Sequence, residues 1–316
     1  MSPTVRGRFA PSPSGRMHLG NVFCALAAWL SCRAQGGRML LRIEDLDPDR
    51  SKPEYARLLE EDLLWLGLDW DEGGLHAPGG PCLQSARREV YAQALDRLRA
   101  QGLLYPCFCT RAELHAAQAP HAGDGRSLYG GRCRSLTEAQ RRELSLLRAP
   151  NLRLAVPDGE VFFDDVFCGP VRRNPARDCG DIVVRRRDGV HAYQLAVVVD
   201  DALMGVSEVI RGRDLLDSTP VQLCLYRLLG YVPPRFGHIP LLVAPDGRRL
   251  SKREKDLDMG ALRARFSGPE PFLGRLAHAA GLLPRAEPVS ARVLVPLYSP
   301  ALLPRRDIVI NPADWT

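Results

Sequence analysis

This sequence has no apolar run long enough to cross a membrane. Its longest apolar stretch, Val22 to Leu30, is far shorter than the about 20 residues that a membrane-spanning helix needs. The N-terminus reaches proline and glycine before any apolar segment, so it lacks the pattern of a secretory signal peptide. We therefore expect a cytoplasmic protein that does not associate with membranes.

A disulfide framework is not expected either. The nine cysteines are odd in number and scattered from Cys24 to Cys224, which favours metal binding or simple burial over pairing. No internal repeat stands out. The sequence does have enough apolar residues, 45%, to fill a core, and its net charge of +6 suits a polyanionic partner such as RNA or a nucleotide.

Strand and helix patterns alternate in the first hundred or so residues. Residues 5–10 form a short apolar segment that ends in the turn Pro-Ser-Pro-Ser-Gly, and a helical pattern runs from His18 to Ala34. Arg38 to Ile43 is typical of a buried strand, whereas Pro53 to Leu66 and Ala86 to Gln101 are typical of helices. This β-α-β order predicts a parallel sheet covered by helices.

The pattern changes between residues 103 and 189, where cysteine, glycine and arginine are frequent and the strands are short. Buried-strand character then returns at Tyr193 to Val199 and at Arg235 to Val243, with a helix at Pro220 to Leu229 between them. We therefore expect an α/β fold in which one segment is inserted between two halves of a sheet.

The turn after the first strand has the features of a phosphate site. It places proline and glycine beside a helix start, where backbone N–H groups and the helix dipole attract anions. Gly20 permits close approach and His18 can donate to a phosphate oxygen. Taken alone, His18 would more often be a surface residue of an ordinary turn. A second, basic segment from Arg249 to Arg253 follows a strand and the turn Pro245 to Gly247, so it would reach the same edge of the sheet.

Together, these two segments resemble the paired HIGH and KMSKS signatures of class I aminoacyl-tRNA synthetases. The first stands here as HLGN and the second as RLSKR, so Asn21 and Arg249 replace the usual histidine and lysine and keep a hydrogen-bond donor. The resemblance implies a Rossmann-type sheet that binds ATP with Mg²⁺. The implied nucleotide contacts are His18, Gly20, Asn21, Arg249, Ser251 and Lys252, of which His18 and Lys252 would be catalytic.

Four further segments narrow the resemblance to the glutamyl and glutaminyl branch of this class. They are Arg8 to Ser12, Arg42 to Asp47, Tyr193 to Asp201 and Ile210 to Leu215. A substrate with two carboxylates and one ammonium group needs two cations and one anion that converge on it. By resemblance, Arg8 and Arg211 supply the cations, Glu44 the anion and Tyr193 a hydroxyl, with Ala10 and Ser12 beside them. Each of these residues alone could instead belong to a surface ion pair or to the core.

Three thiols lie close together in the inserted segment. They are Cys107 and Cys109 of a CxC pair, and Cys133, which follows Tyr129 by four residues. Three thiolates and a fourth donor complete the tetrahedral shell that zinc prefers, although three unrelated buried cysteines would show the same spacing. In the glutamyl branch this pattern is a zinc site with tyrosine as ligand, so the resemblance implies Tyr129 as the fourth donor. His115 and His121 remain alternatives. We expect one structural zinc ion per chain.

After Arg253 there is room only for a helical stretch from Met259 to Leu283 and a proline-rich tail. A full glutamyl-tRNA synthetase carries large anticodon-binding domains after this loop. The short length and the cysteine pattern resemble the glutamyl-queuosine tRNA(Asp) synthetase family. That resemblance implies a monomer that activates L-glutamate without tRNA and transfers it to the queuosine base at the wobble position of tRNA(Asp).

The expected division of the chain has four parts. Residues 1–104 and 191–256 would form the two halves of a Rossmann catalytic domain, 105–190 an inserted zinc-binding α+β domain, and 257–316 a short helical region without an anticodon-binding domain. Two other functions stay open. One is a minimal glutamyl-tRNA synthetase that charges the tRNA 3′ end, and the other is a catalytically silent paralogue that binds RNA.

Overall fold

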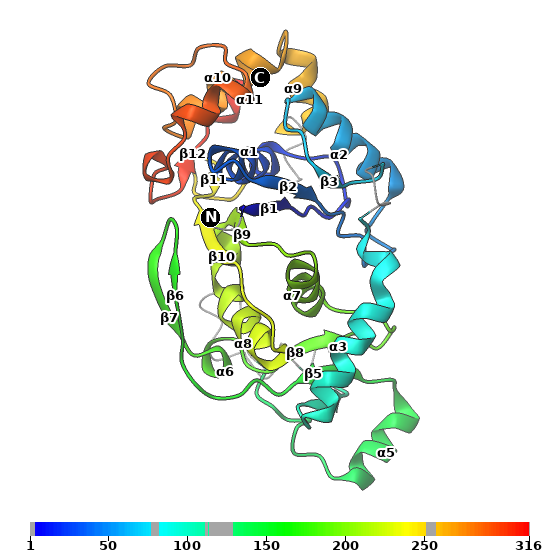
Figure 1. Cartoon of the computed structure of the whole chain (residues 1–316). Coiled ribbons are helices and arrows are strands. Elements are labelled where there is room, and N and C mark those ends of the chain that lie inside the picture. Colours follow the sequence, from blue (N-terminus) through cyan, green and yellow to red (C-terminus); the bar gives the residue numbers. More distant parts are fainter. Residues whose placement is uncertain (1–3, 77–81, 111–112, 114–128, 251–256, 316) are drawn as a thin grey trace.

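A parallel sheet of five strands, in the order β10-β9-β1-β2-β3, forms the centre of the molecule (Figure 1). The computed structural model describes residues 4–76, 82–110, 113, 129–250 and 257–315. The strands of this sheet are β1 (Arg6–Phe9), β2 (Arg38–Leu41), β3 (Glu72–Gly73), β9 (Glu208–Gly212) and β10 (Arg235–Ile239). The chain moves outward from β1 to β3 and later returns to the other side of β1. Ligands bind at the carboxyl ends of strands where such a sheet reverses its order, and the expected α/β fold is confirmed.

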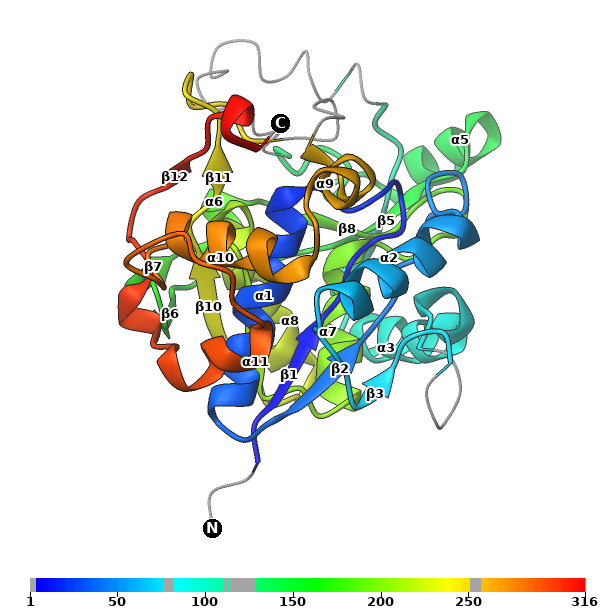
Figure 2. The ribbon, with the colours of Figure 1, turned by 90° about the horizontal axis from the view of Figure 1, so that it is seen from above.

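One face of the sheet is covered by α1 (Leu19–Ala34) and α2 (Pro53–Trp65). Seen from above, α9 (Met259–Arg265), α10 (Pro269–Ala279) and α11 (Ala291–Leu294) lie over α1 (Figure 2). Phe272 and Leu276 of α10, with Trp315 near the end of the chain, belong to the same buried cluster as Leu26 and Leu30 of α1. The C-terminal helices therefore share a core with the first half of the sheet.

The other face of the sheet is covered by α3 (Arg88–Ala100), α7 (Tyr193–Leu203) and α8 (Thr219–Leu229). These helices form a second buried cluster, to which Leu40 of β2 and Phe236 of β10 also belong. Helices on both faces explain why most residues of β2, β9 and β10 are buried.

Three sequence-based element predictions were wrong. Tyr193 to Val199 is not a strand but the start of α7. Its valine run is buried all round, and a short apolar run of this kind has no periodicity that distinguishes a buried strand from a buried helix. Arg235 to Val243 is broken at Pro240, so β11 (Leu242–Val243) leaves the sheet and pairs with β12 (Ile308–Val309). The helical stretch from Met259 to Leu283 is interrupted between α9 and α10.

Between β3 and β9 the chain builds two smaller sheets. The first is antiparallel, in the order β4-β5-β8, and the second is the hairpin β6-β7. Their bounds are β4 (Leu104–Cys107), β5 (Asn151–Leu154), β6 (Val161–Asp165), β7 (Gly169–Arg173) and β8 (Ile182–Arg185), with helices α5 (Glu138–Leu147) and α6 (Pro175–Asp178). The hairpin extends beside β10 (Figure 1), and the Val166 amide donates to the Phe236 carbonyl over 3.0 Å. The inserted segment therefore contacts the edge of the central sheet.

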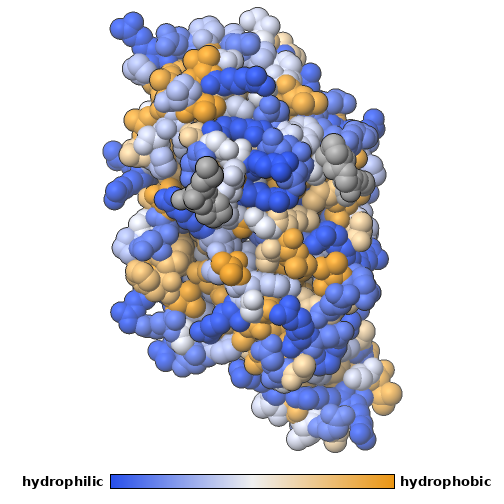
Figure 3. Space-filling view, in the orientation of Figure 1, coloured by the Kyte–Doolittle hydropathy of each residue, from blue (hydrophilic) through white to orange (hydrophobic). Residues whose placement is uncertain are grey.

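The surface mixes polar and apolar residues. On the face shown in Figure 3, hydrophobic groups are small and separated by hydrophilic ones. Within the described ranges, no helix has both the length and the apolar character needed to span a bilayer.

Gly274 on α10 is a position where the packing allows no side chain. A Cβ atom there would lie 1.8 Å from the carbonyl oxygen of Glu287, which is backbone and cannot rotate away. We expect Gly274→Ala to lower the free energy of unfolding by roughly 3 kcal/mol, because the segment that crosses α10 must move. Gly130→Ala is the matched control, since a Cβ there meets no atom of the described residues within 4 Å. Equal denaturant midpoints for the two variants would contradict this account of the packing.

Candidate functional site

Arg211 lies in β9 near the switch point of the sheet, and only 5% of it is exposed. Its Nε donates to Nε2 of His238 over 3.0 Å, and its NH2 donates to Thr219 Oγ1 over 2.8 Å and to Gln222 Oε1 over 2.7 Å. The NH1 nitrogen has a long contact, 3.4 Å, with the Tyr193 hydroxyl. The guanidinium is thus fixed on two sides, and its NH1 side has the weakest partner.

The charge of Arg211 is not neutralised by an acidic neighbour. Its hydrogen-bond partners are all neutral, and in the described part of the chain no carboxylate forms an ion pair with it. Burial lowers the pKa of Arg211 and the positive charge of Arg8 acts in the same direction, against the opposing effects of Tyr193 and of the Asp201 carboxylate. A buried cation whose contacts are all with neutral groups favours an anionic ligand.

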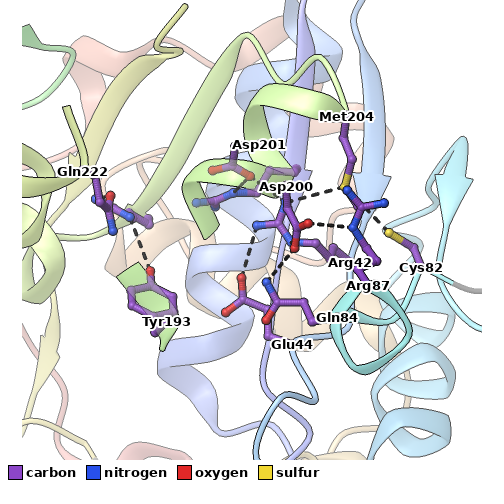
Figure 4. Close-up of polar contacts among 12 residues, drawn as sticks. Arg42, Glu44, Cys82, Gln84, Arg87, Tyr193, Asp200, Asp201, Met204 and Gln222 are labelled. Carbon is purple, nitrogen blue, oxygen red and sulfur yellow. Dashed lines mark hydrogen bonds and ion pairs between the residues drawn. The ribbon is translucent and has the colours of Figure 1, made fainter. Parts of the chain in front are cut away.

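Arg8 and Glu44 are connected through Asp201 and a buried arginine, Arg42, and Figure 4 shows the contacts of Arg42. Arg42 is fully buried, and it donates to Asp201 Oδ1 over 2.6 Å and to Glu44 Oε1 over 3.2 Å. Asp201 also lies 3.6 Å from the Nε of Arg8. Three elements therefore meet here: β1 carries Arg8, the segment after β2 carries Arg42 and Glu44, and α7 carries Asp201.

A second set of contacts anchors Asp200, the neighbour of Asp201 on α7. Its carboxylate accepts hydrogen bonds from Gln84, Arg87 and Tyr91 over 2.7 to 2.8 Å, and it lies 3.8 Å from the Nε of Arg42. Because every donor in this set is held by another element, α7 has little freedom to shift relative to the sheet.

The proposed glutamate residues share one electrostatic environment. Burial raises the pKa of the Glu44 carboxyl, and the positive charges of Arg42 and Arg8 oppose that rise. Burial also raises the pKa of the Tyr193 phenol, on which the charges of Arg211, Glu44 and Arg8 all act. The structure therefore brings together the two cations, the anion and the hydroxyl that the sequence suggested.

Two other sequence-predicted residues stand beside this group. Ala10 follows β1 and is half-buried, whereas Ser12 is exposed. The Glu44 amide donates to the Pro11 carbonyl over 3.0 Å, so this turn runs alongside the segment that carries Glu44.

The predicted phosphate turn is built around His18, which is the N-cap of α1. Its Nδ1 accepts a hydrogen bond from the Gly20 amide over 3.1 Å, and its own amide donates to Asn21 Oδ1 over 3.2 Å. A neutral ring that accepts at Nδ1 carries its proton on Nε2. A Cβ at position 20 would lie 3.0 Å from the imidazole, so glycine is needed there for the histidine to take this position.

The turn is held against two helices by a buried carboxylate. Asp62 of α2 is fully buried and accepts hydrogen bonds of 3.0 Å from Arg16 in the turn and from Arg263 in α9. Burial acts to lower the pKa of Arg16, but the hydrogen bond to Asp62 outweighs it and the pKa is raised. The start of α9 therefore lies beside the turn, where the Met259 amide donates to the Met17 carbonyl over 2.8 Å.

The second nucleotide segment is described only in part. Arg249 donates to Asp214 Oδ2 over 2.9 Å at the surface, and Leu250 is buried. Ser251 and Lys252 lie outside the described residues, as do His115 and His121.

The three cysteines of the predicted zinc site come together. The Sγ atoms of Cys107, Cys109 and Cys133 all lie within 4.8 Å of one another, and this cluster could hold a metal ion such as zinc. The sulfur atoms of Cys109 and Cys133 are 3.5 Å apart, which is far longer than a disulfide bond of about 2.05 Å. Two thiolates bound to one tetrahedral zinc ion at about 2.3 Å would be separated by roughly 3.8 Å.

Tyr129 lies within the same group. Its hydroxyl accepts a hydrogen bond from the Cys133 amide over 2.7 Å, and the guanidinium of Arg153 stacks on its ring at 3.8 Å. Burial raises the pKa of Cys109 to about 12. Burial also acts to raise the pKa of Cys133, but hydrogen bonds, first that of the Tyr129 hydroxyl, lower it overall. Zinc binds the thiolate form, so these thiols suit a metal that displaces their protons.

Several residues of the site were not assigned a role by the sequence. They are Arg42, Asp165, Asp200, Asp201, Thr219, Gln222 and His238, all of which are buried. Some of them could have been found from the sequence, because they are charged residues beside strongly apolar segments. A charge buried in such a place is costly without a partner, so it indicates a polar contact inside the fold.

The comparisons with known proteins agree with this geometry. Residues 4–273 match the family described as "tRNA synthetases class I (E and Q), catalytic domain". The chain is 52% identical to "Glutamyl-Q tRNA(Asp) synthetase" of Symbiobacterium thermophilum over 98% of this chain and 96% of that protein. It is 50% identical, with the same coverage of each chain, to the protein of that name from Nitratidesulfovibrio vulgaris.

Longer relatives match over part of their length. "Glutamate--tRNA ligase" of Sulfurihydrogenibium sp. is 43% identical over 82% of this chain but only 54% of its own length. The crystal structure of a glutamate tRNA ligase from Elizabethkingia meningosepticum in complex with its amino acid superposes with a TM-score of 0.83 at 29% identity, covering 98% of this chain and 68% of that one. This chain therefore belongs to the class I tRNA synthetases of the glutamate and glutamine branch and, within them, to the glutamyl-Q tRNA(Asp) synthetases.

Proposed function

We propose that this protein activates L-glutamate with ATP, without any need for tRNA, and transfers it to the queuosine base at the wobble position of tRNA(Asp). The activation of glutamate is supported by the buried guanidinium of Arg211, which has only neutral partners and contacts the Tyr193 hydroxyl. The transfer to tRNA(Asp) is supported by two relatives, both named "Glutamyl-Q tRNA(Asp) synthetase", that are 52% and 50% identical over nearly their whole length.

In this proposal the two carboxylates of glutamate bind near Arg211 and Arg8, and its ammonium group binds near Glu44. The Tyr193 hydroxyl, half-buried at the first turn of α7, adds a hydrogen bond. Ala10 and Ser12 line the approach along the turn after β1. Arg42 and Asp201 do not touch the substrate but hold Glu44 and Arg8 in place.

Activation joins the α-carboxylate of glutamate to the α-phosphorus of ATP. A new oxygen–phosphorus bond forms as the bond to the β-phosphate breaks, which gives glutamyl-adenylate and pyrophosphate. His18, with Gly20 and Asn21 at the start of α1, would contact phosphate, and Arg249, Ser251 and Lys252 would do so from the other side. No protein nucleophile is required, since alignment and positive charge suffice to stabilise the transition state. Mg²⁺ enters with the nucleotide.

The second step would release AMP. A hydroxyl on the cyclopentene ring of queuosine attacks the activated carbonyl carbon, an ester forms, and the bond to the phosphate breaks. The base would be presented from an unstacked anticodon loop, because single-stranded loops are where proteins read RNA bases.

For the cysteine cluster we propose one structural zinc ion, bound by Cys107, Cys109, Cys133 and Tyr129. These side chains form a small core of their own, with Tyr105 and Ala155, apart from the two large clusters of the molecule. So few apolar residues stabilise a fold weakly, and a metal ion compensates for that. The guanidinium of Arg153 over the Tyr129 ring would stabilise the phenolate form that a metal binds.

We also propose that the chain divides into domains at the points expected from its sequence. The antiparallel sheet β4-β5-β8 and the hairpin β6-β7 fall within residues 105–190, except for the first residue of β4.

The activation step predicts glutamate-dependent exchange between pyrophosphate and ATP with no RNA present. Arg211→Lys should raise the KM for glutamate at least about tenfold, because an ammonium group cannot replace a guanidinium that donates in several directions. Arg235→Lys, at an exposed site on the neighbouring strand β10, should leave the KM unchanged. Exchange that appears only when tRNA is added would contradict the proposal.

The acceptor is tested by comparing radiolabelled glutamate transfer to tRNA(Asp) with and without queuosine. We expect transfer only to the modified tRNA, and the product should survive removal of the 3′ terminal adenosine. Transfer to both tRNAs that is lost with the 3′ adenosine would identify a minimal glutamyl-tRNA synthetase. Transfer to neither, without exchange activity, would point to a silent RNA-binding protein.

Metal analysis of the purified protein should find about one zinc ion per chain. Cys107→Ser and Cys133→Ser should each lose it and lower the melting temperature, because a hydroxyl is a poor zinc ligand and the small core depends on the metal. Cys179→Ser is the matched control, since this half-buried cysteine lies outside the cluster. Wild-type protein without zinc would refute the metal site.

A further inference from the structure

A chain of buried polar groups extends behind Arg211, on the side away from Tyr193. The Arg211 Nε donates to Nε2 of His238 over 3.0 Å, and Nδ1 of the same ring lies 2.6 Å from Oδ2 of Asp165. His238 is in β10 and is fully buried, and Asp165 is the last residue of β6 and is 4% exposed. The three residues thus come from the central sheet and from the inserted hairpin.

The hydrogen bonds among Arg211, His238 and Asp165 determine which ring nitrogen of His238 carries the proton. A guanidinium has donors and no acceptor, so the Nε2 atom that faces Arg211 must accept. The proton of the neutral ring is therefore on Nδ1, from which it is donated to the Asp165 carboxylate. Thr219 lies beside this contact: its Oγ1 accepts from Arg211 NH2 over 2.8 Å and is 3.0 Å from Nε2, whose single lone pair it would share with Arg211 Nε.

We propose that Asp165 and His238 are positioning residues for the amino-acid site: Asp165 holds His238 in the tautomer whose Nε2 accepts from Arg211, and this contact fixes the direction in which Arg211 presents NH1 to the substrate carboxylate. The inference deepens the proposed function and rests on it, because it needs Arg211 to be the glutamate-binding cation. Neither Asp165 nor His238 touches the substrate. They act through Arg211.

The surroundings keep the imidazole neutral and the carboxylate ionised. Burial lowers the pKa of His238, the Asp165 hydrogen bond opposes that shift, and the charge of Arg211 supports it. Burial acts to raise the pKa of Asp165, but the hydrogen bonds from His238 and from backbone amides outweigh it and leave the pKa lowered. A protonated ring would bring an N–H group and a positive charge against the Arg211 Nε.

Asp165 itself is held firmly by its backbone contacts. Its Oδ1 accepts hydrogen bonds from the amides of Phe167, Cys168 and His238 over 2.9 to 3.0 Å. The Phe167 ring packs against β10 at Gly237, where a Cβ would lie 2.8 Å from the ring. The hairpin thus places this carboxylate on the central sheet with little room for adjustment.

Asp165→Asn is the decisive variant. Its amide oxygen can still accept from the three backbone amides, while its NH2 donates to Nδ1 of His238 and so forces the proton onto Nε2. Two donors then face each other between His238 and Arg211. We expect the KM for glutamate in the RNA-free exchange reaction to rise on the order of tenfold, as for loss of a hydrogen bond to a charged group, with the KM for ATP, kcat and melting temperature nearly unchanged.

Asp164→Asn is the matched control. It makes the same chemical change one residue earlier on β6, where the side chain is exposed, so it should leave the KM for glutamate at its wild-type value. The tautomer can be followed directly by ¹⁵N-resolved NMR of the histidine side chains. The His238 signals, identified by their loss in His238→Gln, should show the proton on Nδ1 in the wild type and in Asp164→Asn, and on Nε2 in Asp165→Asn.

A pair of substitutions at His238 separates positioning from packing. His238→Gln offers a neutral oxygen acceptor at about the reach of Nε2 and should keep the KM for glutamate within about threefold of the wild type. His238→Leu fills similar space without an acceptor and should raise the KM on the order of tenfold. If glutamine and leucine behave alike, or if Asp165→Asn keeps the wild-type KM, the positioning role is wrong.

The outcome of Arg211→Lys separates this inference from the proposed function. If Arg211→Lys retains the wild-type KM for glutamate, Arg211 does not bind the substrate and the proposed site fails together with the inference. If Arg211→Lys loses affinity while Asp165→Asn and Asp164→Asn both match the wild type, the glutamate site stands and only the roles of Asp165 and His238 are refuted.

Discussion

The buried guanidinium of Arg42 is the group on which the candidate amino-acid site depends. It is fully buried and contacts three carboxylates, those of Glu44, Asp200 and Asp201. Removing one partner of a buried ion pair typically costs about 3–5 kcal/mol, because the remaining charge stays buried without compensation. Arg42 therefore fixes α7 against the carboxyl end of β2, and the position of Glu44 relative to Arg8 follows from it.

The sheet and the turn before α1 could be predicted from the sequence because their signals are local. Proline and glycine beside the start of α1 indicate a turn, and His18 then caps the helix as the nearest side chain able to accept from the Gly20 amide. The cysteine cluster was also predictable, since two of its thiols are separated by a single residue and the third follows within the same segment.

The polar network behind the site could not be predicted in this way. Arg42 and Asp201 are 159 residues apart along the chain, and His238 and Asp165 are 73 apart. No periodicity or short motif records such a pairing. The strand predicted at Tyr193 failed for a related reason: the valines of α7 are buried by tertiary packing, which overrides the preference of β-branched residues for strands.

The hairpin β6-β7 reaches the central sheet from a segment that otherwise builds its own small sheets. Its last β6 residue, Asp165, is buried and contacts His238 of β10, so the insertion is packed against the central sheet and is not a detachable module. If Asp165 positions Arg211 as proposed, a chimera that takes this insertion from a relative would import a piece of substrate recognition along with it. Evolution of the inserted segment and evolution of amino-acid selectivity would be constrained together.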